Sequence, residues 1–135
     1  MITAIINART NSERLNKKHL YRIGNKTIFE HTIDKLLNIK EVKKIYLASG
    51  SRKNNYDYEK FIKSKYKNKI KFFYYNKEND VTGRIYNLSK KIDTKYSLMI
   101  SGDCPLIDTS FIKRIYKNLS SNIHYDFIYP KNNLI

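Results

Sequence analysis

Short apolar runs alternate with segments of helical spacing along the whole sequence, and this alternation constrains the fold more than any other feature. Runs rich in Ile, Phe, Tyr and Leu, with the length of β-strands, occupy residues 3–7, 44–49, 70–75, 96–101 and 126–129. Apolar residues recur at helical spacing within 27–38, 56–67, 80–92 and 108–119. A parallel strand pair needs a long crossover, which a helix supplies. The sequence therefore predicts an α/β fold with parallel strands joined by helices.

The length of 135 residues fits one domain with a single core, and we expect residues 1–135 to form it. There is no internal repeat and no linker rich in Pro, Gly or Ser. Two helix starts are marked by their side chains. Thr27 and Glu30 form a capping box, and Asp108 stands where an N-cap is expected.

Several classes of protein are excluded by composition. No window approaches 18 consecutive apolar residues, and the apolar stretch 1–6 is too short for a signal peptide, so we expect no membrane partner. Cys104 is the single cysteine, which excludes an internal disulfide and a Cys-based zinc site and favours the cytoplasm. We expect Cys104 to be a small buried residue rather than an activated thiol.

The formal net charge of +15 has two interpretations. The chain is rich in Lys, Asn, Ile and Tyr, residues that A+T-rich codons favour, and its lysines are scattered, as on a solvated surface. The alternative is attraction of a polyanion such as a nucleic acid. No helix-turn-helix, zinc or aromatic ribonucleoprotein motif is present, so a nucleic-acid partner is the less favoured reading.

The segment that follows the first expected strand is basic. It carries four cations with small polar side chains between them: Arg9, Thr10, Asn11, Ser12, Arg14, Lys17 and Lys18. Guanidinium forks, lysines and loop amides together can enclose a phosphate. The other interpretation is a long solvated loop, since the glycines of known phosphate-binding motifs are absent.

Asp103 lies directly after the fourth expected strand, between Gly102 and Cys104. Ligands of open parallel sheets bind beyond the carboxyl ends of the strands, where the strand order reverses. A carboxylate there, beside a basic loop, suits Mg²⁺, which completes its coordination shell with phosphate oxygens and water. The alternative is an aspartate that only caps the turn.

Four segments, 8–18, 28–31, 80–86 and 101–108, resemble the cytidylyltransferase family in order and spacing. More narrowly, they resemble the F-type proteins of spore coat polysaccharide biosynthesis, relatives of the acylneuraminate and 3-deoxy-manno-octulosonate cytidylyltransferases. The resemblance extends from residue 2 to about residue 129. It implies a Rossmann-like nucleotidyltransferase fold of three layers, α/β/α, with a mainly parallel sheet. It also implies an enzyme that uses CTP and Mg²⁺, transfers CMP to a sugar or sugar acid in polysaccharide biosynthesis, and releases pyrophosphate.

The same resemblance assigns residues to the site. The family's basic-loop pattern is matched by Ala8, Arg9, Ser12, Arg14, Leu15 and Lys18, which would hold the triphosphate with Thr10 and Asn11 between them. Asp103, after Gly102, matches the metal carboxylate, and Arg84 matches an arginine near the nucleotide. Arg14, Lys18 and Asp103 are the expected catalytic residues.

The chain departs from the family at two kinds of position. Asn11 replaces the usual glycine, and Asn16-Lys17 replaces a Pro-Gly pair, which affects the loop backbone but not its charges. Family members are also far longer, so we expect an N-terminal portion that lacks the acceptor-binding part, dimer contacts and a further metal-binding acid. An active transferase and a truncated CTP-binding module that does not catalyse are both open. A homodimer, or pairing through the edge of the fifth strand, is a further expectation.

Overall fold

The computed structural model describes residues 1–11, 15–119 and 124–129. Its main sheet has four parallel strands in the order β5-β4-β1-β6. Their bounds are β1 Ile2–Asn7, β4 Val42–Ser49, β5 Ile70–Tyr74 and β6 Ser97–Ser101. A small antiparallel hairpin, β2 (Arg22–Ile23) and β3 (Lys26–Thr27), follows the 3₁₀ helix η1 (Lys18–Leu20).

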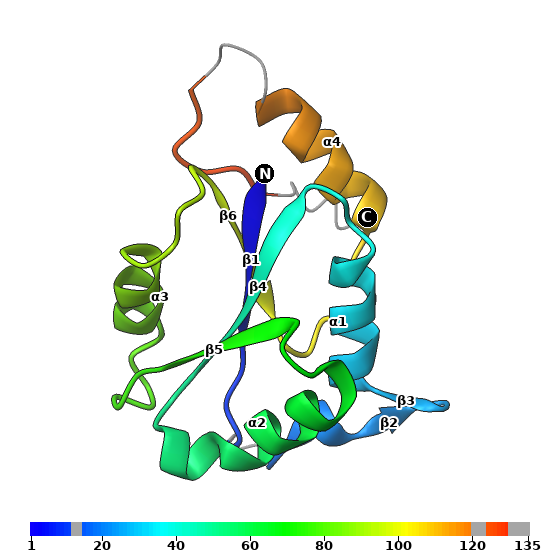
Figure 1. Cartoon of the computed structure of the whole chain (residues 1–135), viewed down its shortest axis with the longest axis vertical. Coiled ribbons are helices and arrows are strands. Elements are labelled where there is room, and N and C mark those ends of the chain that lie inside the picture. Colours follow the sequence, from blue (N-terminus) through cyan, green and yellow to red (C-terminus); the bar gives the residue numbers. More distant parts are fainter. Residues whose placement is uncertain (12–14, 120–123, 130–135) are drawn as a thin grey trace, which may run out of the picture.

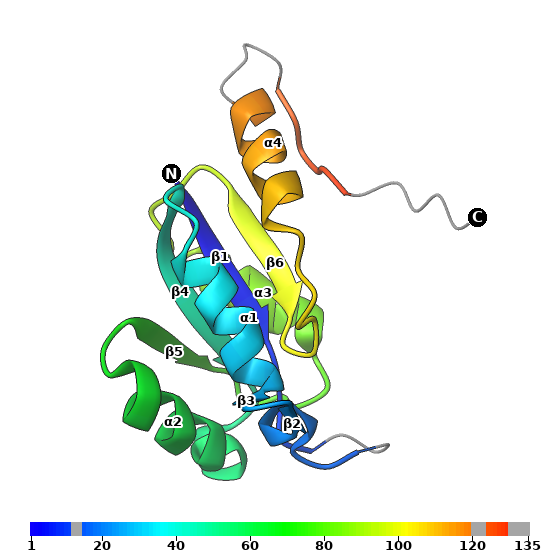
Figure 2. The same ribbon diagram turned by 90° about the vertical axis from the view of Figure 1, so that its right-hand side faces the viewer.

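Helices cover both faces of this sheet (Figure 1). The helices α1 (Ile28–Leu37), α2 (Arg52–Tyr66) and α4 (Thr109–Leu119) pack on one face, and α3 (Val81–Ser89) packs on the other. Figure 2 shows α1 and α3 on opposite sides of β1. Successive side chains of a strand point to opposite faces, so Ala4 and Ile6 enter the larger core and Ile5 the smaller one beneath α3. The expected α/β fold with three layers and a parallel sheet is confirmed.

The helix starts follow from local side-chain chemistry. The predicted capping box is present, because Thr27 accepts a hydrogen bond from the Glu30 amide and Glu30 accepts one from the Thr27 amide. Asp108 accepts from the amides of Ser110 and Phe111, as expected of an N-cap. The helix expected at 56–67 begins earlier, at Arg52, because Ser51 caps it. The short hairpin and η1 were not predicted.

Two expectations are wrong. Residues 126–129 form no strand. Side chains from this segment instead line a cavity together with residues of α4 and β6, and Phe127 and Tyr129 are largely exposed. Within the described residues, β6 is therefore an edge strand. Cys104 is exposed rather than buried, because it lies in the turn after β6.

The strand order reverses at β1. The chain runs from β1 to β4 and β5 on one side, and then returns to β6 on the other side. The register pairs Asn7 with Ser101, so the carboxyl ends of β1 and β6 lie level. The loops that follow these two strands meet at the position where open parallel sheets bind ligands.

No helix in the described part of the chain is long and apolar enough to cross a membrane.

Candidate functional site

The loops after β1 and β6 are in close contact because Gly102 has no side chain. The Gly102 amide donates to the Asn7 carbonyl over 2.9 Å. A Cβ atom at Gly102 would lie 2.8 Å from the Ala8 Cβ and 2.8 Å from the His19 Cδ2. Contacts this short are not tolerated, so glycine is required for the approach. Two predicted site residues, Ala8 and Gly102, are thereby adjacent.

Lys18 and Asp103, both predicted for the site, form an ion pair across these loops. The Ser101 hydroxyl donates to the other oxygen of the carboxylate. Partial burial favours the neutral acid, but the bonds from Lys18 and Ser101 outweigh it and lower the pKa of Asp103 to about 2. Since 33% of the Asp103 side chain is exposed, an ionised carboxylate is open to a ligand.

A buried histidine beside Lys18 fixes η1 against the rest of the site. His19 stacks on Phe29 with 4.9 Å between ring centroids, and its Nδ1 lies 2.7 Å from the Tyr58 hydroxyl. The Tyr58 hydroxyl also donates to the Arg9 carbonyl over 3.3 Å. Burial, aided by the charge of Lys18, lowers the pKa of His19 to about 4. His19 is therefore neutral at pH 7 and links η1, α2 and the β1 loop.

Arg9 and Arg84 meet at one backbone carbonyl. Arg84 donates to the Glu78 carbonyl over 2.7 Å, and Arg9 reaches the same oxygen over 3.5 Å and also the Asn79 side chain. Arg84 is completely buried, donates to the Asn7 side chain over 2.7 Å, and has no partner for its Nε among the described residues. Burial lowers the pKa of Arg84. This arginine lies beneath the strand ends, and its contact with a nucleotide stays a prediction.

The remaining predicted residues of the loop after β1 differ in their exposure to solvent. Thr10 is buried, and its amide donates to the Asn55 side-chain oxygen over 2.8 Å. Asn11 is exposed. Ser12 and Arg14 lie outside the described residues, so their roles stay predictions. The sequence reasoning missed Asn55, Glu78 and His19, because the side-chain partners that connect them to the site are 23 to 45 residues away in the sequence.

A cavity of about 470 Å³ opens beside the strand ends, between α3 and β6. It is lined mainly by apolar side chains, with polar groups at the strand ends. The lining residues are Asn7, Val81, Thr82, Ile85, Tyr86, Met99, Ile100 and Ser101. A cavity of this size and character accommodates a small ring system next to the charged loops.

A divalent ion bound at this site would need oxygen ligands. Within residues 1–11, 15–119 and 124–129, no three His, Cys, Asp or Glu side chains gather as a metal cage. Mg²⁺ does not need one, since it is commonly held by one or two carboxylates with phosphate oxygens and water. The ionised, partly exposed Asp103, with a cation beside it for phosphate, fits that pattern.

The chain matches known proteins over most of its length. The model of the cytidylyltransferase family matches residues 3–133. An uncharacterised protein of Methanocaldococcus jannaschii is 30% identical over 131 residues, which are 97% of this chain and 52% of that protein. The chain thus spans about half the length of this relative.

Solved structures share the fold. A CMP:2-keto-3-deoxy-manno-octonic acid synthetase complexed with CTP matches with a TM-score of 0.72 and 20% identity, over 90% of this chain and 48% of that one. A cytidylyltransferase from Leptospira borgpetersenii has a TM-score of 0.72 and 25% identity, over 87% and 48%. The 4-diphosphocytidyl-2C-methyl-D-erythritol synthase of Anaerococcus prevotii has a TM-score of 0.65 and 24% identity, over 90% and 51%.

Proposed function

Because the chain belongs to the cytidylyltransferase family, we propose that it binds CTP with Mg²⁺ and serves the transfer of CMP to a sugar or sugar acid with release of pyrophosphate. Within the family we assign it to the F-type proteins of spore coat polysaccharide biosynthesis, which its four segments resemble. The single observation that carries the proposal is the pairing of Lys18 with Asp103 at the switch point between β1 and β6.

In this proposal, Lys18 is the phosphate-binding group and Asp103 the metal-binding group, and the two side chains are in hydrogen-bond contact. A lysine binds a phosphate as a point charge, and a carboxylate suits Mg²⁺. A triphosphate with its Mg²⁺ would satisfy both groups, since the ligand brings a negative partner for Lys18 and a positive partner for Asp103. The ion pair then exchanges for contacts with the ligand.

The chemistry is a displacement at the α-phosphorus of CTP. A bond forms from an acceptor oxygen to phosphorus, and the bond from phosphorus to the bridging oxygen of pyrophosphate breaks. Such reactions depend on positioning and on neutralising charge. Arg9 and Lys18, with Arg14 as a further expected contributor, would bind phosphate oxygens. Mg²⁺ held by Asp103 would neutralise charge on the phosphates.

The cavity between α3 and β6 is the proposed place for the nucleoside part of CTP. It lies next to Ser101 and Asn7 at the strand ends, so a triphosphate on Lys18 would leave its nucleoside within reach. Its apolar lining suits the faces of a ring, and its polar rim suits hydroxyl groups.

The acceptor and the assembly are further parts of the proposal. The chain spans about half the length of its relative, and we assign the choice of acceptor to no described residue of this chain. Transfer by these 135 residues alone, or CTP binding without transfer, are the two forms to be distinguished. We further propose that the enzyme acts in the cytoplasm and forms a homodimer.

Calorimetric titration of CTP in Mg²⁺, with ATP and UTP as competitors and a repeat in EDTA, tests the proposal. We expect binding that prefers CTP and weakens in EDTA. Release of pyrophosphate on addition of a sugar acid would identify a transferase, and binding without release would identify a CTP-binding module. If none of the three nucleotides binds, the proposed function is wrong.

A further inference from the structure

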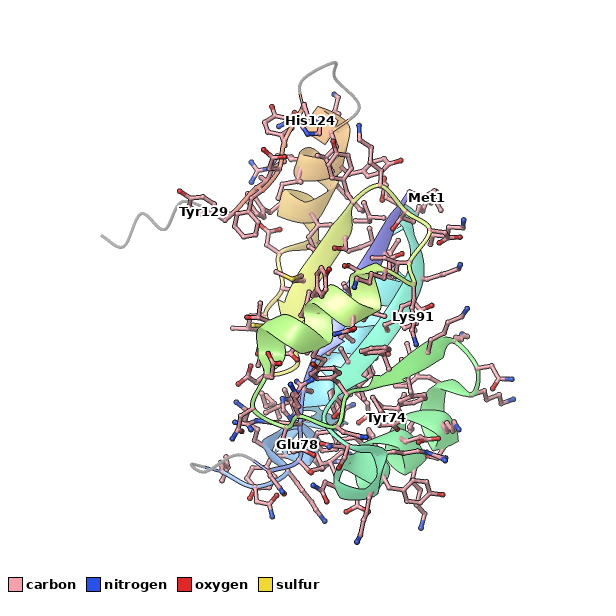
Figure 3. All side chains as sticks on the ribbon, turned by 90° about the vertical axis from the view of Figure 1, so that its left-hand side faces the viewer. Met1, Tyr74, Glu78, Lys91, His124 and Tyr129 are labelled. Carbon is pink, nitrogen blue, oxygen red and sulfur yellow. The ribbon has the colours of Figure 1, made fainter. Side chains whose placement is uncertain are left out.

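We propose that Glu78 is a positioning residue, which through Asn55 and its own carbonyl holds Thr10 and Arg9, directly after β1, in place for phosphate binding. This inference rests on the proposed function for its consequence in CTP binding, although the positioning itself can be measured without a ligand. Figure 3 shows Glu78 in the loop that leads into α3, at the end of the molecule where β1 ends and α2 begins.

The Glu78 carboxylate gathers donors from the first turn of α2. Its Oε1 accepts from the Ser51 amide over 2.9 Å, the Ser51 hydroxyl over 3.1 Å and the Asn54 side chain over 3.1 Å. The Asn55 Nδ2 donates to the same oxygen over 3.2 Å. Partial burial would raise the pKa of Glu78, but these bonds outweigh it and keep the pKa below its ordinary value. The Asn55 Nδ2 also donates to the Ser51 carbonyl over 2.8 Å, so the carboxylate and this carbonyl together fix the orientation of the Asn55 amide group.

Asn55 transmits this orientation to the loop. It is completely buried and departs from helical backbone angles inside α2, with φ −113° and ψ 15°. Its amide nitrogen donates to Glu78, so its oxygen faces Thr10, where it accepts from the Thr10 amide over 2.8 Å and from the Thr10 hydroxyl over 3.2 Å. A chain of hydrogen bonds therefore runs from Glu78 to the residue beside Arg9.

The backbone of Glu78 reaches the same loop by a second route. Its carbonyl accepts from Arg9, which precedes Thr10, and from Arg84, which holds Asn7 at the end of β1. Side chain and backbone of Glu78 thus constrain three successive features: the strand end, Arg9 and Thr10.

Gly50 provides an independent way to move the carboxylate. A Cβ atom at Gly50 would lie 1.8 Å from the Glu78 Oε2. The side chain of Glu78 is flexible and can retreat, so Gly50→Ala should displace the carboxylate while leaving Glu78 itself in place. If Glu78→Gln and Gly50→Ala change Thr10 exchange and ligand affinity in the same way, the position of the carboxylate is the cause.

Glu59 is the matched control. It is a buried carboxylate within α2, and it binds Arg52, Lys63 and Tyr74, with its pKa lowered to about 2 mainly by the bond from Arg52. None of these partners belongs to the loop after β1. Glu59→Gln therefore removes a comparable set of bonds at another place.

The experiment measures hydrogen exchange at the Thr10 amide and the affinities for CTP and for inorganic tripolyphosphate, both in Mg²⁺. For Glu78→Gln and Gly50→Ala we expect faster exchange at Thr10 and roughly tenfold weaker binding of both ligands, the loss expected when a hydrogen-bonded charge is disturbed. Glu59→Gln should lower the unfolding midpoint but leave exchange at Thr10 and both affinities as in the wild type.

Unchanged exchange at Thr10 in both variants would overturn the inference, whatever the ligands do. An equal acceleration of exchange at Thr10, or an equal loss of binding, in Glu59→Gln would also overturn it, because the effect would then be general destabilisation. If exchange at Thr10 rises as expected but the wild type binds neither CTP nor tripolyphosphate, the positioning role stands and the proposed function fails.

Discussion

The Asp103 carboxylate is the residue on which the metal assignment depends, and its replacement gives a direct prediction. Asp103→Asn should abolish the enhancement of CTP binding by Mg²⁺, because an amide is a poor ligand for this ion. Binding in EDTA should fall much less. Calorimetric titration with and without Mg²⁺ measures both quantities.

Asp93→Asn is the matched control for this change. Asp93 also has its pKa lowered to about 2, by Lys44 and Lys43, which flank the start of β4 rather than the site. Its replacement should leave the Mg²⁺ enhancement intact. An enhancement that survives in Asp103→Asn would make Asp103 a structural residue of the turn.

His19 predicts a pH dependence of stability. Its pKa is about 4 in the folded chain and 6.5 when exposed. Between these values the unfolded chain binds the proton at His19 and the folded chain does not. The contribution of His19 to stability is therefore fully present above pH 6.5 and is lost as the pH falls to 4. The loss in the free energy of unfolding should be about 2 kcal/mol at pH 4.5 and about 3 kcal/mol below pH 4. Urea unfolding at pH 7 and pH 4.5 measures it.

The variant His19→Gln separates this histidine from the carboxyl groups. It should be less stable at pH 7 but should lose little more on acidification to pH 4.5. His31→Gln, which replaces the histidine bonded to the Ile23 carbonyl on the surface, should keep the wild-type slope. An identical slope in wild type and His19→Gln would mean that His19 is not the titrating group.

Single residues were predictable from sequence where the chemistry is local. Lys18 and Asp103 were expected at one site because each lies in a loop that follows a strand, and the carboxyl ends of the two strands are adjacent in the sheet. The structure brings the two side chains together as an ion pair. Glu78 and Asn55 carry no such signal. Their importance comes from contacts with Ser51 and Thr10, which only the folded chain brings near.

At the scale of elements, periodicity predicted the four strands of the sheet and the existence of all four α-helices. It was wrong for 126–129, which form no strand and leave Phe127 and Tyr129 largely exposed, because a short apolar run does not by itself specify a strand partner. It also missed Ser51 as the start of α2, since the first turn of that helix is polar and its cap is satisfied by the distant Glu78. The hairpin of β2 and β3 is too short to show a pattern.

The capping box of α1 yields a prediction for this element. Thr27→Ala removes the acceptor of the Glu30 amide and should lower the free energy of unfolding by about 1 kcal/mol. Thr82→Ala, at an exposed position of α3, should change it by less than about 0.5 kcal/mol. Chemical denaturation compares the two. Equal losses would show that the cap of α1 contributes nothing specific.

At the scale of the whole molecule, the net charge of +15 attracts anions before any contact forms. Such a field raises association rates and is screened by salt, whereas contacts within a site determine dissociation. Surface lysines distant from the site and Lys18 inside it should therefore affect different steps of CTP binding.

Lys40 and Lys69 are suitable distant charges, because they are exposed and precede β4 and β5, at the end of the sheet opposite the site. The double variant Lys40→Gln with Lys69→Gln should slow CTP association, with a smaller difference at high salt, and leave the dissociation rate unchanged. Lys18→Gln should instead speed dissociation. Stopped-flow measurements at two salt concentrations separate the two rates. Faster dissociation in the double variant would place the ligand on the basic surface, as a general polyanion site requires, and not at the ends of β1 and β6.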